Sequence, residues 1–287
     1  MKINATDNFF THAKPIWAKG LEKEKNITLG LYKNIRCESG SAILKIAASG
    51  FYKVFVNGKF TYFGPARCAH GYYRVDEIEL NLKKGENHIA IETVNYYVNS
   101  FYSLMQSGFI EAELVSDGAA AAVTDEAGEN AFELYELCER IRRVQRYSYQ
   151  RPFAEAYRLT ENFCGWRTGA NGANVSPRSV VITDEKCLLP RNIPASTFTE
   201  VSPCSSVCGG SAVFGIKPEK YRKDRSLIYI KNPASGNLEG FFENELCEHL
   251  SDEAQEIRSE ITDDRRTEYS GNTALGAGEF EILEFPC

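Results

Sequence analysis

Two strand-like runs joined by a single Asn-Gly pair leave few alternatives to a β-hairpin. Residues 51–56 and 59–63 are rich in Phe, Tyr, Val and Thr, and only Asn57 and Gly58 separate them. A two-residue type I′ turn needs positive φ at both central positions, which Asn and Gly tolerate best. The sequence therefore predicts a tight antiparallel hairpin. Gly64-Pro65 ends it, because proline donates no N–H to a sheet.

Further strand-like segments follow at short intervals. Residues 42–48 have the composition of a buried strand, and residues 88–94 alternate along the chain in a strand-like period of two. Residues 75–82 and 109–115 are also strand-like, and a Lys-Lys-Gly-Glu-Asn turn separates two of these segments. Several short strands punctuated by turns are typical of an antiparallel sandwich. We therefore predict an all-β protein built as an antiparallel β-sandwich.

Helix is expected in one or two short segments. Residues 129–143 place Phe132, Tyr135 and Cys138 on one helical stripe. Residues 251–259 offer Ser251 as an N-cap with acidic residues in the first turn. Both segments are predicted to be helical.

A connector is predicted where two prolines fall close together. Residues 188–196 read Leu-Leu-Pro-Arg-Asn-Ile-Pro-Ala-Ser, and proline disfavours regular structure at and before its own position. We expect an extended segment without regular secondary structure and a domain boundary nearby. The predicted division is a first module over residues 1–187, followed by the connector and a partial second module over residues 188–287.

The net charge and the lengths of the apolar runs argue against two classes of partner. The net charge is −6 and the pI is near 5.5, which argues against nucleic acid because phosphate binding needs clustered Lys and Arg. No run approaches the ~20 apolar residues that span a bilayer. The first residues also lack the apolar segment of a signal peptide. We expect neither a nucleic acid nor a membrane partner.

The cysteines indicate a reducing compartment rather than a metal site. There are nine, an odd number without framework spacing, so we expect free thiols and a cytoplasmic location. Cys204 and Cys208 are four residues apart, but no second Cys or His pair lies nearby in the sequence to complete a tetrahedral zinc site. No metal site is predicted.

The sequence contains no familiar catalytic motif. A Gly-x-Ser-x-Gly elbow, a phosphate loop and a dinucleotide fingerprint are all absent, so no cofactor and no catalytic residue is predicted. A glycosidase needs two carboxylates roughly 5–10 Å apart across a sugar. Asp76 and Glu155 form the alternative catalytic pair. Asp76 is otherwise expected to anchor its loop by accepting hydrogen bonds from backbone groups or from Arg67.

Aromatic residues gather beyond the predicted strand ends. Their faces can stack on the apolar face of a sugar ring while Arg, Asn and Asp bind its hydroxyl groups. Capping of the two sheets is the alternative role, because Tyr and Phe favour strands and cores. The predicted carbohydrate-binding residues, which combine stacking faces with hydrogen-bonding groups, are Arg67, His70, Tyr72, Tyr73, Tyr96 and Tyr97.

Three stretches together are similar to a known family. "ASGFYKVFVNGKFTYFGPAR", "GENHIAIETVNYY" and "YSYQRPFAEAY" resemble the N-terminal β-sandwich modules of bacterial α-L-rhamnosidases of glycoside hydrolase family 78. The stretches "LLPRNIP" and "GEFEILEF" are similar to the passage into the second sandwich module of that family. This sequence departs from the family at Lys84, where proline is usual, and at Glu284-Phe285-Pro286, where Asp-Phe-Gly is typical.

The resemblance implies a jelly-roll, galactose-binding-like fold with a sugar-associated role. Rhamnosidases of this family cleave with carboxylates held in an (α/α)₆ barrel, and this sequence has no comparable set of helices. We therefore expect a non-catalytic N-terminal region, a fragment or a relic, of such a hydrolase. It would bind a neutral rhamnosyl glycan weakly or scaffold a missing downstream catalytic domain. The alternatives are a small stand-alone glycosidase and a protein-interaction module that binds no sugar.

Overall fold

The computed structural model describes residues 8–144, 146, 152–169, 175–216, 240–241, 245 and 256–286. They form two compact units. The first holds the described residues up to Ser196 together with residues 240–241 and 245, and the second holds the described residues from Thr197 onward that remain. The described residues contain many strands and one 3₁₀ turn, η1 (Gly165–Thr168), but no α-helix. The prediction of an all-β protein is confirmed.

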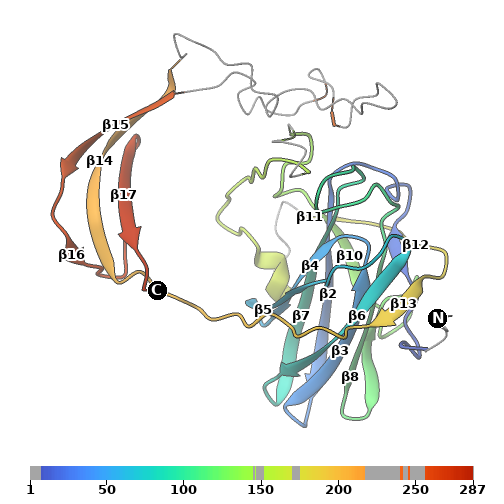
Figure 1. Ribbon diagram of the computed structural model, residues 1–287. Coiled ribbons are helices and arrows are strands. Elements are labelled where there is room, and N and C mark those ends of the chain that lie inside the picture. The colour runs from blue at the N-terminus through green and yellow to red at the C-terminus, as the bar shows by residue number, and fades with distance from the viewer. Residues whose placement is uncertain are drawn as a thin grey trace. The chain divides into compact units, whose positions relative to one another are not determined.

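Two sheets make up the first unit, and their strands lie side by side in Figure 1. The seven-stranded sheet has the order β12-β1-β8-β3-β6-β13, and β9 pairs with β8. Its strands are β1 (Ile16–Ala18), β3 (Ser41–Ala48), β6 (Tyr72–Asn81), β8 (Ile110–Ser116), β9 (Ala119–Val123), β12 (Val180–Ile182) and β13 (Cys187–Pro190).

The second sheet of this unit has six antiparallel strands in the order β11-β10-β2-β7-β4-β5. Its strands are β2 (Ile27–Cys37), β4 (Phe51–Val56), β5 (Lys59–Gly64), β7 (Gly85–Asn95), β10 (Glu133–Leu137) and β11 (Val175–Pro177). The core consists of alternate residues from both sheets, which is the pattern of a β-sandwich. Among its fully buried members are Leu29, Val54 and Ile91 from this sheet and Leu44, Ile46 and Leu114 from the other.

The predicted hairpin is confirmed as β4 and β5. Val56 pairs with Lys59, and the two turn residues have φ of 51° at Asn57 and 80° at Gly58. The amide of Asn57 donates to the side-chain oxygen of Asn87 at 3.0 Å. Asn87 lies near the start of β7, so its buried side-chain amide joins the hairpin tip to the neighbouring strand.

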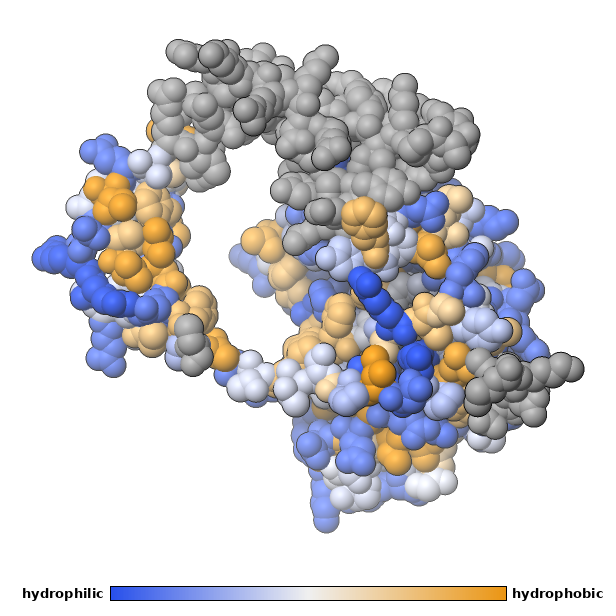
Figure 2. All heavy atoms as spheres, in the orientation of Figure 1, coloured by the Kyte–Doolittle hydropathy of each residue, from blue (hydrophilic) through white to orange (hydrophobic). Residues whose placement is uncertain are grey.

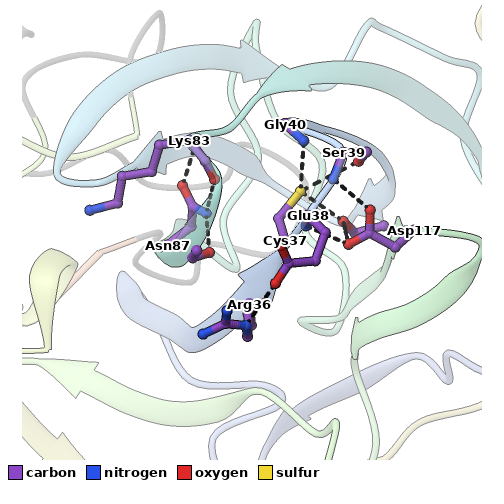
Figure 3. Close-up of polar contacts among 10 residues, drawn as sticks. Arg36, Cys37, Glu38, Ser39, Gly40, Lys83, Asn87 and Asp117 are labelled. Carbon is purple, nitrogen blue, oxygen red and sulfur yellow. Dashed lines mark hydrogen bonds and ion pairs between the residues drawn. The ribbon is translucent and has the colours of Figure 1, made fainter.

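Side-chain hydrogen bonds close the turns at the edge of the sandwich (Figure 3). Asn87 exchanges two bonds with the backbone of Lys83, at 2.8 and 3.1 Å. Asp117 accepts the N–H groups of Glu38 and Ser39, both at 2.8 Å. These backbone bonds lower the pKa of the Asp117 carboxyl. The turns are thus fixed by single polar side chains, as is usual for Asn and Asp.

The helix prediction for residues 129–143 is wrong. This segment contains strand β10 (Glu133–Leu137), which pairs with β2 and β11. Phe132 and Leu134 both enter the core, so a period of two describes the segment better than a helical stripe. Pairing with neighbouring strands overrode the local helical pattern.

Two further expectations need correction. Within the predicted helix over residues 251–259, residues 256–259 belong to strand β15 (Glu256–Asp263), and residues 251–255 lie outside the described residues. The start of the predicted irregular connector forms β13 (Cys187–Pro190), which runs parallel to β6. Because β13 is an edge strand, Pro190 can end it without breaking a central ladder.

The second unit is a four-stranded antiparallel sheet. Its strands are β14 (Ser205–Ile216), β15, β16 (Thr267–Glu268) and β17 (Glu279–Glu284), with β14 pairing to the other three. Hydrophobic side chains gather over this sheet in Figure 2. Ile261 and Ile282 are among the exposed ones, and the strand register places both on the same face of the sheet. An exposed apolar face of this kind is typical of a sheet that packs against another layer.

Candidate functional site

The predicted binding residues meet in one pocket of the first unit. The pocket has a volume of about 270 Å³ and is formed by the loop after β5, the start of β6 and the loop after β7. Five of the six predicted residues line it, namely Arg67, His70, Tyr72, Tyr73 and Tyr96. Tyr97 is not part of the lining. It is half-buried and has a φ of 48°. The backbone turns at this residue, and its side chain lies outside the pocket lining.

Gly64 allows the chain to turn into the pocket loop. A Cβ atom at this position would lie 2.4 Å from the hydroxyl oxygen of Tyr52 and 2.6 Å from Oδ2 of Asp76. Only glycine fits this close approach. The loop from Pro65 to His70 then runs along the pocket before β6 begins.

Tyr73 forms a fixed wall of the pocket. Its hydroxyl donates to Oε1 of Gln106 at 3.0 Å, and Gln106 in turn donates to the carbonyl of Ser49 at 2.7 Å. Its ring meets the edge of Phe109 with the centroids 4.6 Å apart. Burial raises the pKa of the Tyr73 hydroxyl, with a smaller contribution from Cys187. The ring is therefore both a part of the core and a surface of the pocket.

Arg67 and Tyr102 form the open side of the pocket. The guanidinium carbon of Arg67 lies 5.2 Å from the centroid of the Tyr102 ring, and Tyr102 is 54% exposed. The neighbouring Phe101 also lines the pocket and is 66% exposed. The predicted site lacked both aromatic residues. The sequence placed both residues in a loop after a strand, but it did not show which side of the loop their side chains occupy.

Tyr96 forms the deep wall of the pocket. It is 8% exposed and contacts Phe51 and Phe153, with both centroid distances at 6.3 Å. His70 and Tyr72 are exposed at the rim. The pocket thus combines aromatic surfaces with Arg, His, Gln and Asn side chains, and it can stack one face of a small polar ring while bonding to its edge.

Asp76 is a buried anchor. It has no exposed surface, and its Oδ1 accepts from Nη1 of Arg191 at 2.6 Å. The hydroxyl of Tyr52 donates to its other oxygen, Oδ2. Asp76 is thus a buried anchor, but its donors are Arg191 and the Tyr52 hydroxyl rather than the predicted backbone groups or Arg67.

Glu155, the other carboxylate of the alternative catalytic pair, has different surroundings. Its side chain is 54% exposed, and it accepts from the Tyr157 hydroxyl at 2.9 Å. It borders two other pockets, of about 220 and 550 Å³, whose linings do not include Asp76. The structure does not bring Asp76 and Glu155 to either of these pockets together.

Neither a metal-binding cluster nor a long apolar helix occurs among the described residues. Among them, no group of three or more His, Cys, Asp and Glu side chains is placed to hold a metal ion. None of the helical segments in the described part of the chain is long and apolar enough to cross a membrane.

The fold and its loop pocket define a β-sandwich module with a small, aromatic-lined pocket. No protein-family model and no curated protein matches the sequence. Among solved structures, the family 78 rhamnosidase of Bacillus sp. GL1 is similar over 74% of this chain, with 26% identity and a TM-score of 0.57. The resemblance to α-L-rhamnosidases of this family is confirmed. The chain covers only 22% of that enzyme.

Two other solved structures are similar at lower scores. The α-L-rhamnosidase from Aspergillus terreus matches 96% of this chain and 36% of its own, with 13% identity and a TM-score of 0.44. A lectin from Pleurotus ostreatus in complex with GalNAc matches 71% of this chain and 61% of its own, with 15% identity and a TM-score of 0.39.

Proposed function

We propose that this chain is a non-catalytic, carbohydrate-associated N-terminal region of an α-L-rhamnosidase-type glycoside hydrolase. It binds a neutral sugar weakly in the loop pocket. The observation that carries this proposal is the convergence of Arg67, His70, Tyr72, Tyr73 and Tyr96 on one pocket of about 270 Å³. The similarity to the rhamnosidase of Bacillus sp. GL1 supports the sugar class, a rhamnosyl glycan.

The lining of the pocket suits an uncharged ring. Tyr73 and Tyr102 offer aromatic surfaces, and Arg67 and His70 can bond to hydroxyl groups at the rim. Each stacked ring contributes about 1 kcal/mol beyond its area burial. A shallow site of this kind binds with a dissociation constant near millimolar, or roughly −4 kcal/mol.

A titration with L-rhamnose and rhamnosyl oligosaccharides tests the proposal. In calorimetry, Tyr102→Ala should weaken binding about fivefold, because one stacking face is lost. Phe60→Ala is the matched control, since Phe60 is an exposed aromatic residue outside the pocket lining. Equal binding by the parent, Tyr102→Ala and Arg67→Ala would remove this pocket from consideration. No binding of any sugar would favour the protein-interaction module.

The surroundings of Asp76 weigh against the small-glycosidase alternative. A catalytic carboxylate must contact its substrate, and Asp76 is fully buried and bonded to Tyr52 and Arg191. Scaffolding of a downstream catalytic domain remains compatible with weak sugar binding.

We propose two modules, as predicted over residues 1–187 and 188–287, although β13 and the residues up to Ser196 belong to the first unit of the structure. The exposed Ile261 and Ile282 on one face of the four-stranded sheet support a partial second sandwich module. A cytoplasmic location is proposed on the free thiols, since all seven cysteines in the described residues are unpaired. Labelling of the native protein with a thiol reagent tests this location.

A further inference from the structure

Two pockets lie on the outer face of the six-stranded sheet. Their volumes are about 330 and 220 Å³, and both are lined by Lys53, Glu92 and Arg140. Lys53 and Glu92 stand at positions of β4 and β7 that alternate with core residues. The two linings therefore share one charged strip on a sheet face, and the smaller pocket also shares Phe51 and Tyr96 with the loop pocket.

Most charges of this strip are already paired. The carboxylate of Glu92 binds Nζ of Lys53 at 3.1 Å and Nη2 of Arg167 at 2.9 Å. Glu139 accepts the N–H of Cys164 at 2.8 Å. Burial raises the pKa of the Glu139 carboxyl, against smaller opposing effects of Cys164 and Arg167.

Arg140 is paired more loosely, with Glu155. Its side chain is only 5% exposed, yet Nε and Nη2 make no hydrogen bond. The nearest carboxylate oxygen, Oε1 of Glu155, is 3.5 Å from Nη2, which is too far for a good hydrogen bond. Nε–H and Nη2–H form the side of a guanidinium that binds a carboxylate through two parallel bonds. Buried donors left without acceptors are costly.

A second buried polar atom faces the same space. The hydroxyl of Thr28 lines the larger pocket and has no hydrogen-bond partner among the described residues. The described lining of this pocket holds three cations and two carboxylates, and the third carboxylate of the strip is Glu155, which lines the smaller pocket and contacts Arg140 at 3.5 Å. The cations are Lys53, Arg140 and Arg167, and the carboxylates are Glu92 and Glu139.

We propose that this strip binds a small organic molecule carrying one carboxylate, of the size of a single-ring sugar acid. The carboxylate takes the place of Glu155 on the free edge of Arg140, and Thr28 bonds to a neighbouring polar group. The ligand can displace Glu155 from Arg140, because the Glu155 side chain is 54% exposed and its contact with Arg140 is 3.5 Å long. Tyr157 and Phe163 provide aromatic walls for the body of the ligand.

Glucuronate and glucose test the proposal, because they differ only in the carboxylate at carbon 6. Calorimetry of the whole chain at neutral pH should show glucuronate binding at least about tenfold more tightly than glucose. Arg140→Lys keeps the charge but removes the two-bond edge, so glucuronate affinity should fall about tenfold. Arg178→Lys is the control, since Arg178 pairs with Glu136 outside both pockets.

Glu155→Gln provides an independent readout on an exposed residue. It removes the competing carboxylate, so glucuronate should bind more tightly than to the parent, and this holds even if Arg140→Lys fails to fold. Equal affinity for glucuronate and glucose would overturn the proposal. A folded Arg140→Lys variant with parental affinity, or a Glu155→Gln variant with unchanged or weaker affinity, would overturn it as well.

Discussion

Arg191 donates from Nη1 to the carboxylate of Asp76 at 2.6 Å, across 115 residues of sequence. The same nitrogen also donates to the Tyr62 hydroxyl at 2.9 Å. The rest of the guanidinium donates to the carbonyls of Ile193 and Pro194, both at 3.0 Å. One ion pair therefore fixes the segment after β13 to the strand that begins beside the loop pocket.

The first prediction concerns this ion pair. Asp76→Asn should lower the free energy of unfolding by about 3 kcal/mol, because it removes one partner of a buried, hydrogen-bonded pair. Urea denaturation measures this change. The control is Arg178→Ala, which breaks a pair whose arginine side chain is 43% exposed and should cost less than about 1 kcal/mol. Equal stability of Asp76→Asn and the parent would rule out an anchoring role.

The second prediction is a pH dependence that arises at Glu111. Burial raises the pKa of this carboxyl from 4.5 to about 7, with Lys186 opposing the shift and Glu113 and Glu185 adding to it. Between these two pH values the folded chain binds more protons than the unfolded chain. The contribution of Glu111 to stability therefore falls as the pH rises from about 4.5 to about 7 and stays low above that.

Glu111→Gln tests this dependence because it stays neutral. Relative to the parent, the variant should be about 1–3 kcal/mol more stable at pH 8 than it is at pH 5. Urea denaturation at both pH values gives the comparison. Glu77→Gln is the control, since the Glu77 side chain is 60% exposed. A stability difference between Glu111→Gln and the parent that does not vary with pH would contradict the prediction.

The third prediction concerns the segment before β1. Oε2 of Glu113 accepts the N–H groups of Thr11, His12 and Ala13 at 2.9, 2.7 and 3.0 Å. Glu113→Ala should release this segment and destabilise the chain by about 2 kcal/mol, because three backbone donors lose a charged acceptor. Hydrogen exchange at these three amides should become much faster. Unchanged protection would show that other contacts hold the segment, and Glu79→Ala, an exposed site on β6, should leave it unchanged.

The fourth prediction is that the purified chain does not hydrolyse aryl α-L-rhamnosides. Asp76 is buried, and the two pockets that Glu155 borders do not include it, so a pair facing one substrate is not assembled there. A chromogenic rhamnoside assay measures this directly. Turnover that disappears in Asp76→Asn or Glu155→Gln would establish the small-glycosidase alternative instead.

Local signals in the sequence predicted the parts of the fold that depend on neighbouring residues. The hairpin at Asn57 and Gly58 followed from turn chemistry, and β7 of the same sheet followed from its alternating pattern, whereas β2 and β11 were not predicted. The segment over residues 129–143 could not be predicted in this way, since its strand β10 exists only because β2 and β11 pair with it. Long-range pairing of that kind overrides local preference.

The candidate site shows the same limit. Arg67, His70, Tyr72 and Tyr73 follow one another closely in the chain, so their convergence could be expected. Tyr97 and Tyr102 lie in a single loop, and only the backbone path determines which of the two reaches the pocket. The pairing of Asp76 with Arg191 joins distant segments and leaves no local pattern that sequence reasoning could detect.

Binding of L-rhamnose in the loop pocket is tested most directly by NMR on protein with ¹³C-labelled tyrosine rings. Addition of L-rhamnose should shift the ring signals of Tyr72, Tyr73 and Tyr102, which line the pocket. The rings of Tyr32 and Tyr135, which are absent from its lining, should keep their positions. A saturable response confined to the first group is the predicted result. Rhamnose binding that shifts only tyrosines outside the pocket, or no response at millimolar concentrations, would contradict it.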